Sequence, residues 1–138
     1  MKNFYKILLL LLSLLLITCS DDNSVNNTRS PYNGKWLWLK TVGELFPRVI
    51  TPNEGTTIKI NYDELYTFKL YRNDSLKVEA NYKIEESEND WDKISYSNIS
   101  TNNYNFYSNP EYAEINTDTL LIWDGVIDGY FRFYKKIP

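Results

Sequence analysis

Residues 76–85, LKVEANYKIE, decide the fold of this chain, because apolar and polar side chains alternate there without a break. A period of two places all the apolar side chains on one face of a β-strand, whereas a helix would scatter them around its axis. Such alternation is typical of an antiparallel strand with one face in the core and one in water. The predicted core face of this strand consists of Leu76, Val78, Ala80, Tyr82 and Ile84.

Seven other segments carry strand patterns, and turn residues separate them. Asn73 and Asp74, for example, directly precede the central stretch, and both residue types tolerate the backbone angles of a hairpin turn. No window beyond the N-terminal region shows the helical period of about 3.6 residues. Eight short consecutive strands predict a closed barrel or a two-layer sandwich, and closure removes the exposed strand edges. The other seven predicted strands are 34–40, 56–61, 65–71, 91–99, 112–116, 119–123 and 129–136.

The order of several short motifs resembles that of a known family. Gly34-Lys35-Trp36 has the Gly-x-Trp form that opens lipocalins, and Lys135-Lys136 ends an aromatic last segment. Across residues 33–137 the chain resembles the small lipocalin-like lipoproteins of Bacteroidota. This resemblance implies an all-β fold, an eight-stranded antiparallel up-and-down barrel, over residues 31–138. Between the two ends, the shared motifs are Thr51-Pro52, Tyr71-Arg72-Asn73, Asn81-Tyr82-Lys83-Ile84 and Asp118-Thr119-Leu120.

The resemblance also implies a role for Trp36, which would plug one end of the barrel beneath a basic side chain from the last strand. We expect Lys135 to be that basic residue, because Phe131 and Phe133 share its face of the strand. Arg132 would then point to solvent. A cation on an aromatic face contributes about 0.5–2 kcal/mol. The alternative is that Trp36 is a core residue with no cation above it.

Residues 1–22, MKNFYKILLLLLSLLLITCSDD, predict where the protein resides. A positive start with Lys2 and Lys6 precedes an apolar run over 7–17, which is shorter than the ~20 residues of a membrane span. The tetrapeptide Leu16-Ile17-Thr18-Cys19 resembles a bacterial lipobox, which implies cleavage before Cys19 and a diacylglyceryl group on its sulfur. Cys19 is also the sole cysteine of the chain, so no internal disulfide can form. The alternatives are an uncleaved short anchor and an ordinary leader.

This interpretation divides the chain into a lipoprotein signal peptide over 1–18, a lipidated cysteine with a flexible tether over 19–30, and the barrel domain over 31–138. The tether is polar and has too few apolar side chains to form a core. Ser20-Asp21-Asp22 resembles the acidic export signal of surface lipoproteins in Bacteroidota. We therefore expect an outer-membrane protein, held by membrane lipid through Cys19, on the cell surface or, as the alternative, on the periplasmic face.

The composition argues against several classes of function. The chain has no histidine, which excludes a Ser-His-Asp triad, a Cys-His pair and histidine metal ligands. Without residues 1–18, 13 basic residues stand against 18 acidic ones, and this net charge of −5 argues against a nucleic-acid partner. Asp124 and Asp128 flank a turn that lacks the regular oxygen ligands of a calcium loop. We therefore expect no catalytic residue, no metal site and no cofactor.

Aromatic residues are in surplus, at 16% of the chain. Ligand pockets are mostly apolar and aromatic with a few polar groups, so we expect a non-catalytic module that binds a small apolar or amphipathic molecule. The long loop is crowded with aromatic residues, which we expect either to line the barrel mouth and contact the ligand or to cover the barrel end: Tyr104, Phe106, Tyr107 and Tyr112. The alternative function is a surface-interaction or carbohydrate-binding protein that has a filled barrel and uses this aromatic loop from the outside. The residues predicted to line the barrel interior and contact the ligand are Tyr66, Phe68, Tyr82, Tyr96 and Phe133.

Overall fold

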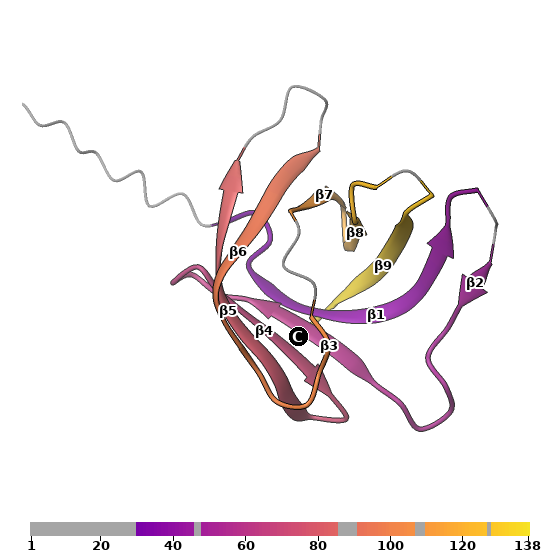
Figure 1. The fold of residues 1–138 in the computed structure, drawn as a ribbon, viewed down its shortest axis with the longest axis horizontal. Helices are drawn as coiled ribbons and strands as arrows, with labels where there is room; N and C mark the ends of the chain where they lie inside the picture. Colours follow the sequence, from indigo (N-terminus) through magenta and orange to yellow (C-terminus); the bar gives the residue numbers. More distant parts are fainter. Residues whose placement is uncertain (1–29, 46–47, 86–90, 107–109, 127) are drawn as a thin grey trace, which may run out of the picture.

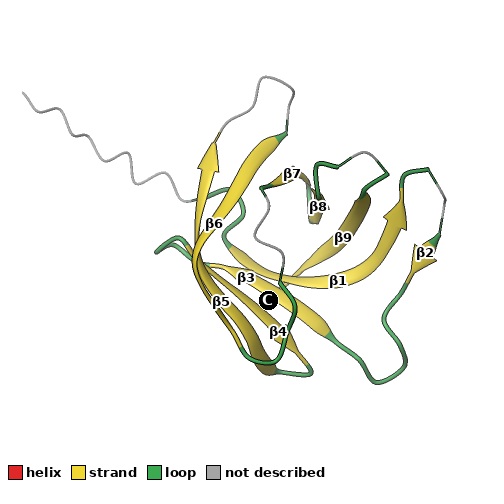
Figure 2. Ribbon diagram, viewed as in Figure 1, coloured by secondary structure: helices red, strands yellow, loops and turns green. Residues whose placement is uncertain are grey.

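A computed structural model of the protein describes residues 30–45, 48–85, 91–106, 110–126 and 128–138. The predicted signal peptide, Cys19 and the tether up to residue 29 lie outside these residues. Every regular element in the described part is a β-strand (Figure 2). No helix there is long and apolar enough to cross a membrane.

The strands of the described residues form one antiparallel sheet that closes on itself (Figure 1). Each strand pairs with a neighbour in sequence order, and the pairing of β1 with β9 completes the ring. The short β2 pairs only with the end of β1, so the barrel itself has the eight strands that the sequence predicts. The strands are β1 (Gly34–Gly43), β2 (Val49–Ile50), β3 (Ile58–Tyr62), β4 (Thr67–Arg72), β5 (Ser75–Glu85), β6 (Asp92–Thr101), β7 (Glu111–Asn116), β8 (Thr119–Trp123) and β9 (Tyr130–Ile137).

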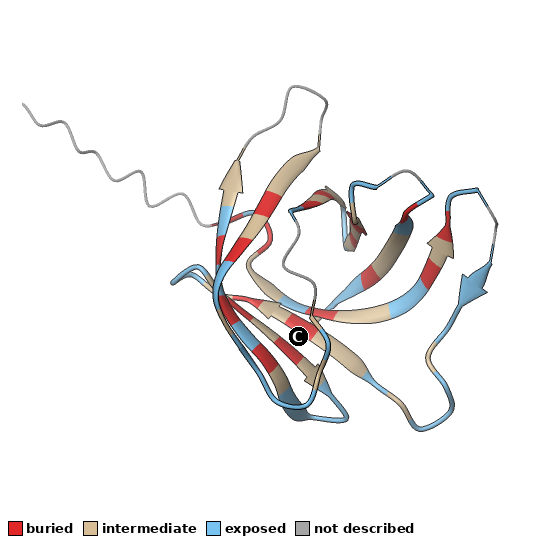
Figure 3. Ribbon diagram, viewed as in Figure 1, coloured by how far each residue is buried: buried red, intermediate tan, exposed pale blue. Residues whose placement is uncertain are grey.

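The alternation of the central stretch appears in the structure as alternating burial along β5 (Figure 3). Val78, Ala80 and Tyr82 are buried in the barrel, as the pattern predicts. Leu76 is an exception and is 38% exposed. A bulge explains this difference. Leu70 of β4 pairs with Val78, but the next residue, Tyr71, pairs with Leu76, so Lys77 is an extra residue in β5. The extra residue turns Leu76 toward the outer face.

One end of the barrel is closed by the segment that leads into β1. Trp36 is fully buried, and its Nε1 donates to the carbonyl oxygen of Tyr32 at 2.8 Å. The Tyr32 hydroxyl donates to Asp92 Oδ2 at 2.7 Å and lies 3.0 Å from the carbonyl oxygen of Ala113. These bonds fix Tyr32 beneath three separate strands. Trp36 is therefore a core residue, and Tyr32 ties the segment before β1 to β6 and β7.

The cation over Trp36 is Lys136, so the prediction of Lys135 is wrong. Lys136 Nζ lies 5.2 Å from the centre of the indole ring. In the β1–β9 register Trp36 pairs with Lys136, whereas Lys135 pairs with Leu37 on the opposite face. Residues directly opposite each other on paired strands share a face. The sequence misleads because β9 carries aromatic side chains on both faces.

The wall between β6 and β7 is only partly paired. Three residue pairs join the two strands, from Asp92 with Ala113 to Ile94 with Glu111. The loop that follows β6 packs Phe106 against the core, with ring centres 5.6 Å from Phe68 and 5.3 Å from Tyr96. This loop therefore covers the interior where the ladder between β6 and β7 ends.

Candidate ligand-binding cavity

A cavity of about 480 Å³ occupies the other half of the barrel. Its rim lies where β1 meets β2 and where the chain turns from β8 to β9, and Val126 and Tyr130 are exposed there. The volume falls within the ~300–1,000 Å³ of small-molecule sites. Its apolar wall consists of Trp38, Ile50, Ile58, Leu70, Tyr104 and Phe106, and its polar groups come from Thr41, Asn105, Glu111, Asp124, Arg132 and Tyr134.

A bulge in β1 builds one wall of this cavity. Trp38 pairs with Tyr134, but the next pair is Lys40 with Phe133, so Leu39 is the extra residue. The shift lets both Trp38 and Thr41 face the cavity, although three positions separate them. Trp38 Nε1 donates to Thr41 Oγ1 at 3.0 Å, which satisfies the indole donor inside the barrel.

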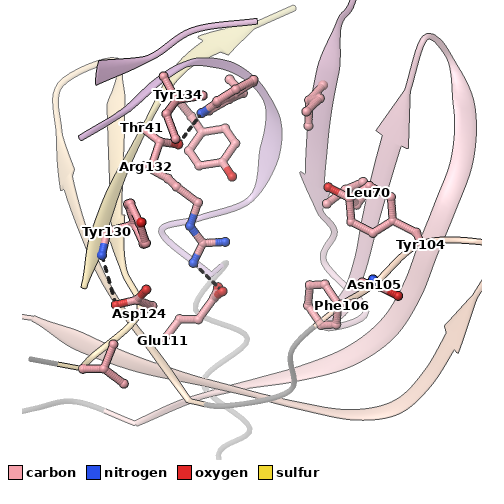
Figure 4. A pocket seen from close by; sticks show the side chains of 14 residues that line it. Thr41, Leu70, Tyr104, Asn105, Phe106, Glu111, Asp124, Tyr130, Arg132 and Tyr134 are labelled. Atoms are coloured by element: carbon pink, nitrogen blue, oxygen red, sulfur yellow. Dashed lines mark hydrogen bonds and ion pairs between the residues drawn. The ribbon is translucent and has the colours of Figure 1, made fainter. Parts of the chain in front are cut away.

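The polar centre of the cavity is an ion pair between Arg132 and Glu111 (Figure 4). Arg132 Nη2 lies 2.5 Å from Glu111 Oε1, and the hydroxyl of Tyr96 donates to Glu111 Oε2 at 2.9 Å. The Tyr96 and Tyr62 hydroxyl oxygens are 2.8 Å apart. Both carboxylate oxygens are therefore held, and the guanidinium projects into the cavity opposite Phe106 and Tyr104.

Burial and charge set the protonation states of this network. Burial is the largest single effect on Arg132 and lowers its pKa. The charge and hydrogen bond of Glu111, together with the nearby Tyr134 and Tyr96, outweigh burial, so the pKa rises above its usual value. Burial raises the pKa of Tyr134 to about 12, despite the opposing effect of Arg132. Burial also raises the pKa of Tyr62 and Tyr96 well above 10.0. At neutral pH the cavity thus presents one guanidinium beside neutral phenols.

Three of the five predicted ligand residues lie in the core. Phe68, Tyr82 and Tyr96 are buried and make ring contacts with Tyr62 or Phe106. None of the three is among the cavity-lining residues. They fill the closed half of the barrel, and the cavity begins where this aromatic packing ends.

The interior placement of Tyr66 and Phe133 is wrong. Tyr66 is 46% exposed and belongs to the turn before β4, where its backbone has a φ of 58°. Its backbone N–H donates to the carbonyl oxygen of Asp63 in the turn, and β4 begins at the next residue, Thr67. Phe133 faces outward beneath Lys40, whose Nζ lies 4.8 Å from the centre of its ring.

The sequence predicts that Tyr104 and Phe106 line the barrel mouth, and both line the cavity, but it does not single out the polar pair of Arg132 and Glu111. Arg132 was expected to point to solvent, yet it faces inward because Tyr134, two positions on, is buried. The sequence signal for an inward-facing Arg132 was its position between aromatic residues on both sides. Nothing in the local sequence singles out Glu111, because its partner lies 21 residues away.

The aromatic residues of the long loop after β6 lie on both the inner and the outer face of the barrel. Tyr104 and Phe106 point inward and line the cavity, so they are not available on the surface as the alternative function requires. Tyr107 lies outside the described residues. Tyr112 does face outward, and its ring centre lies 5.4 Å from that of Trp123. Four outward-facing rings lie together here, and we term them the outer aromatic cluster: Trp91, Tyr112, Trp123 and Phe131. Within it, the rings of Trp123 and Phe131 are stacked, with their centres 6.1 Å apart.

Two further findings bear on the function. Among the residues that the structure describes, no three His, Cys, Asp or Glu side chains gather as a metal site would require. No protein-family model, curated protein or solved structure matches the chain.

Proposed function

We propose that the protein is a lipid-anchored lipoprotein of the cell envelope whose barrel binds a small amphipathic molecule without catalysis. The cavity carries this proposal, because it joins apolar walls to a polar centre at Arg132 and Glu111. Small-molecule sites have this composition, with apolar walls for contact area and a few polar groups for orientation. The resemblance to lipocalin-like lipoproteins supports the same function.

The proposed anchor is the acylated sulfur of Cys19. A charged start, a short apolar run and a single cysteine at its end support this assignment. One acyl chain gives marginal attachment, whereas two or more hold a protein firmly. The ten residues over 21–30, polar except for Val25, span at most roughly 35 Å at ~3.3 Å per residue, so the barrel would remain near the bilayer.

The anchor has a direct test in the native host. Cells grown with radiolabelled palmitate should label the wild-type chain and not the Cys19→Ser variant, and globomycin should make the unprocessed precursor accumulate. An unlabelled wild-type chain would overturn the lipoprotein assignment and leave the cavity proposal standing.

Ligand binding is tested with a neutral fluorescent probe, N-phenylnaphthylamine, which brightens in apolar sites. The wild-type barrel should bind the probe saturably. Ile50→Trp, at the rim of the cavity, should reduce the affinity about tenfold or more. Leu65→Trp is the matched control, because Leu65 is 85% exposed and does not line the cavity. Equal probe binding by the two variants would place the probe elsewhere and contradict the proposal.

The outer aromatic cluster favours a second candidate function, carbohydrate binding on the barrel surface. Trp91, Tyr112, Trp123 and Phe131 are half-buried and lie together on the outer face. A glycan array would test this candidate, since Trp91→Ala should remove any signal that depends on the cluster. Binding that survives Trp91→Ala would exclude the cluster as its source.

A further inference from the structure

We propose that the cavity selects a neutral amphiphile whose head is a hydrogen-bond acceptor, such as an ester, in preference to a free carboxylate or another anion. This inference rests on the proposed function and names the class of ligand. It follows from the charge balance of the polar centre, from the fixed position of Glu111, and from the donors that Arg132 leaves unused.

The cation of the cavity already has its counter-ion. Arg132 is the single basic residue among the described residues that line the cavity, and Glu111 lies 2.5 Å from it. The pair has no net charge. Asp124, which also lines the cavity, adds a negative charge. An anionic head would have to lose its hydration shell and then face two carboxylates for one guanidinium, which disfavours its burial.

Glu111 cannot readily turn aside for a ligand anion. Its Oε1 is held by Arg132 and its Oε2 by the Tyr96 hydroxyl. Tyr96 is held in turn by Tyr62, and both phenols are buried. Glu111 itself is only 7% exposed, so its carboxylate is held with little contact to solvent. The counter-ion of Arg132 is therefore part of the barrel wall.

The guanidinium nevertheless keeps donors for a neutral head. A guanidinium has five N–H groups. Nη2 makes the contact with Glu111, and the side chain also hydrogen-bonds to Tyr134, so these two bonds do not use all five donors. The side chain of Arg132 keeps 28% of its surface accessible, and it faces the cavity. A carbonyl or hydroxyl oxygen can accept from it without adding charge. Trp38, Leu70 and Phe106 then provide the apolar surface for the rest of the ligand.

The test compares three ligands of equal chain length on the full chain at neutral pH: dodecanoate, methyl dodecanoate and monododecanoylglycerol. Displacement of N-phenylnaphthylamine gives each affinity. We expect both esters to bind about tenfold more tightly than dodecanoate, a factor equal to about 1.4 kcal/mol. An acid that binds as tightly as its esters overturns this inference and leaves the proposed function intact. Failure of all three to bind overturns both.

A charge variant tests the cause of the preference. Glu111→Gln should leave Arg132 without a counter-charge, so the ratio of acid to ester affinity should rise about tenfold. Glu54→Gln removes the same charge from an exposed loop and should leave the ratio unchanged. Asp124→Asn, near the rim, should raise the ratio less than Glu111→Gln and provides the test if that variant does not fold. A ratio that none of these variants changes contradicts the charge argument.

Discussion

Glu111 and Arg132 meet inside the barrel although their strands are not neighbours in the sheet. Glu111 begins β7 and Arg132 lies in β9, and β8 runs between these strands. The ion pair therefore bridges a whole strand and links the rim of the cavity to the wall beside β6. Its position gives both a stability prediction and the ligand preference.

Removing one partner of this pair should cost more than removing both. Arg132→Met leaves the buried Glu111 carboxylate without its counter-ion. Loss of one partner of a fully buried pair costs about 3–5 kcal/mol, and because Arg132 keeps 28% of its side-chain surface accessible we expect a loss at the lower end of that range. The double variant Arg132→Met with Glu111→Leu removes both charges and should lose less than the single variant. Urea denaturation measures each free energy of unfolding. A double variant that loses as much as Arg132→Met and Glu111→Leu added together would show that the pair does not couple as the structure indicates.

Lys136 and Lys135 form a matched pair for testing the plug. Lys136→Met removes the cation above Trp36 and should lower the free energy of unfolding by about 0.5–1 kcal/mol. Lys135→Met removes the same charge from the other face and should have a smaller effect. Equal losses for the two variants, measured by urea denaturation, would contradict the contact with the indole.

The buried tyrosines predict loss of stability at alkaline pH. The pKa of Tyr134 is raised from 10.0 to about 12 in the folded state, so above pH 10 the unfolded chain loses a proton that the folded chain keeps. The free energy of unfolding therefore falls between pH 10 and 12, by about 1.4 kcal/mol per pH unit for this residue. Below pH 10 its contribution is fully present. Tyr134→Phe should reduce the slope by that amount, and an unchanged slope would contradict the burial of this phenol.

Gly125 should tolerate substitution less well than Gly55. Both have positive φ values, 71° and 73°, so alanine is strained by about 1 kcal/mol or more at either position. At Gly125 a Cβ would also lie 2.6 Å from the ring of Tyr112, whereas at Gly55 nothing lies within 4 Å. Thermal unfolding should show a larger loss for Gly125→Ala. Equal losses would show that Tyr112 moves away without cost.

The eight barrel strands were predictable because one face of most of them is apolar and the other polar. In β5 and β3 the buried residues Val78 and Ile60 fall where alternation places them. The alternation of apolar and polar side chains fails in β9, where both faces carry aromatic residues. Phe131 and Phe133 lie on one face, and Tyr130 and Tyr134 lie on the other. Local sequence cannot choose between two aromatic faces.

The candidate site could not be predicted for related reasons. The bulge at Leu39 brings Thr41 to the cavity, and the alternation of apolar and polar residues does not show where a bulge occurs. Glu111 acquires its role from the tertiary pairing of distant strands. The predicted aromatic residues Phe68, Tyr82 and Tyr96 are inside, but they form the floor on which the cavity rests.

Native mass spectrometry of the full chain, purified from its own host, tests the central claim most directly. We predict a wild-type protein that carries a non-covalently bound neutral amphiphile, and an Ile50→Trp variant that has lost it. A wild-type protein that carries no small molecule, or one retained equally by Ile50→Trp, would contradict ligand binding in the cavity.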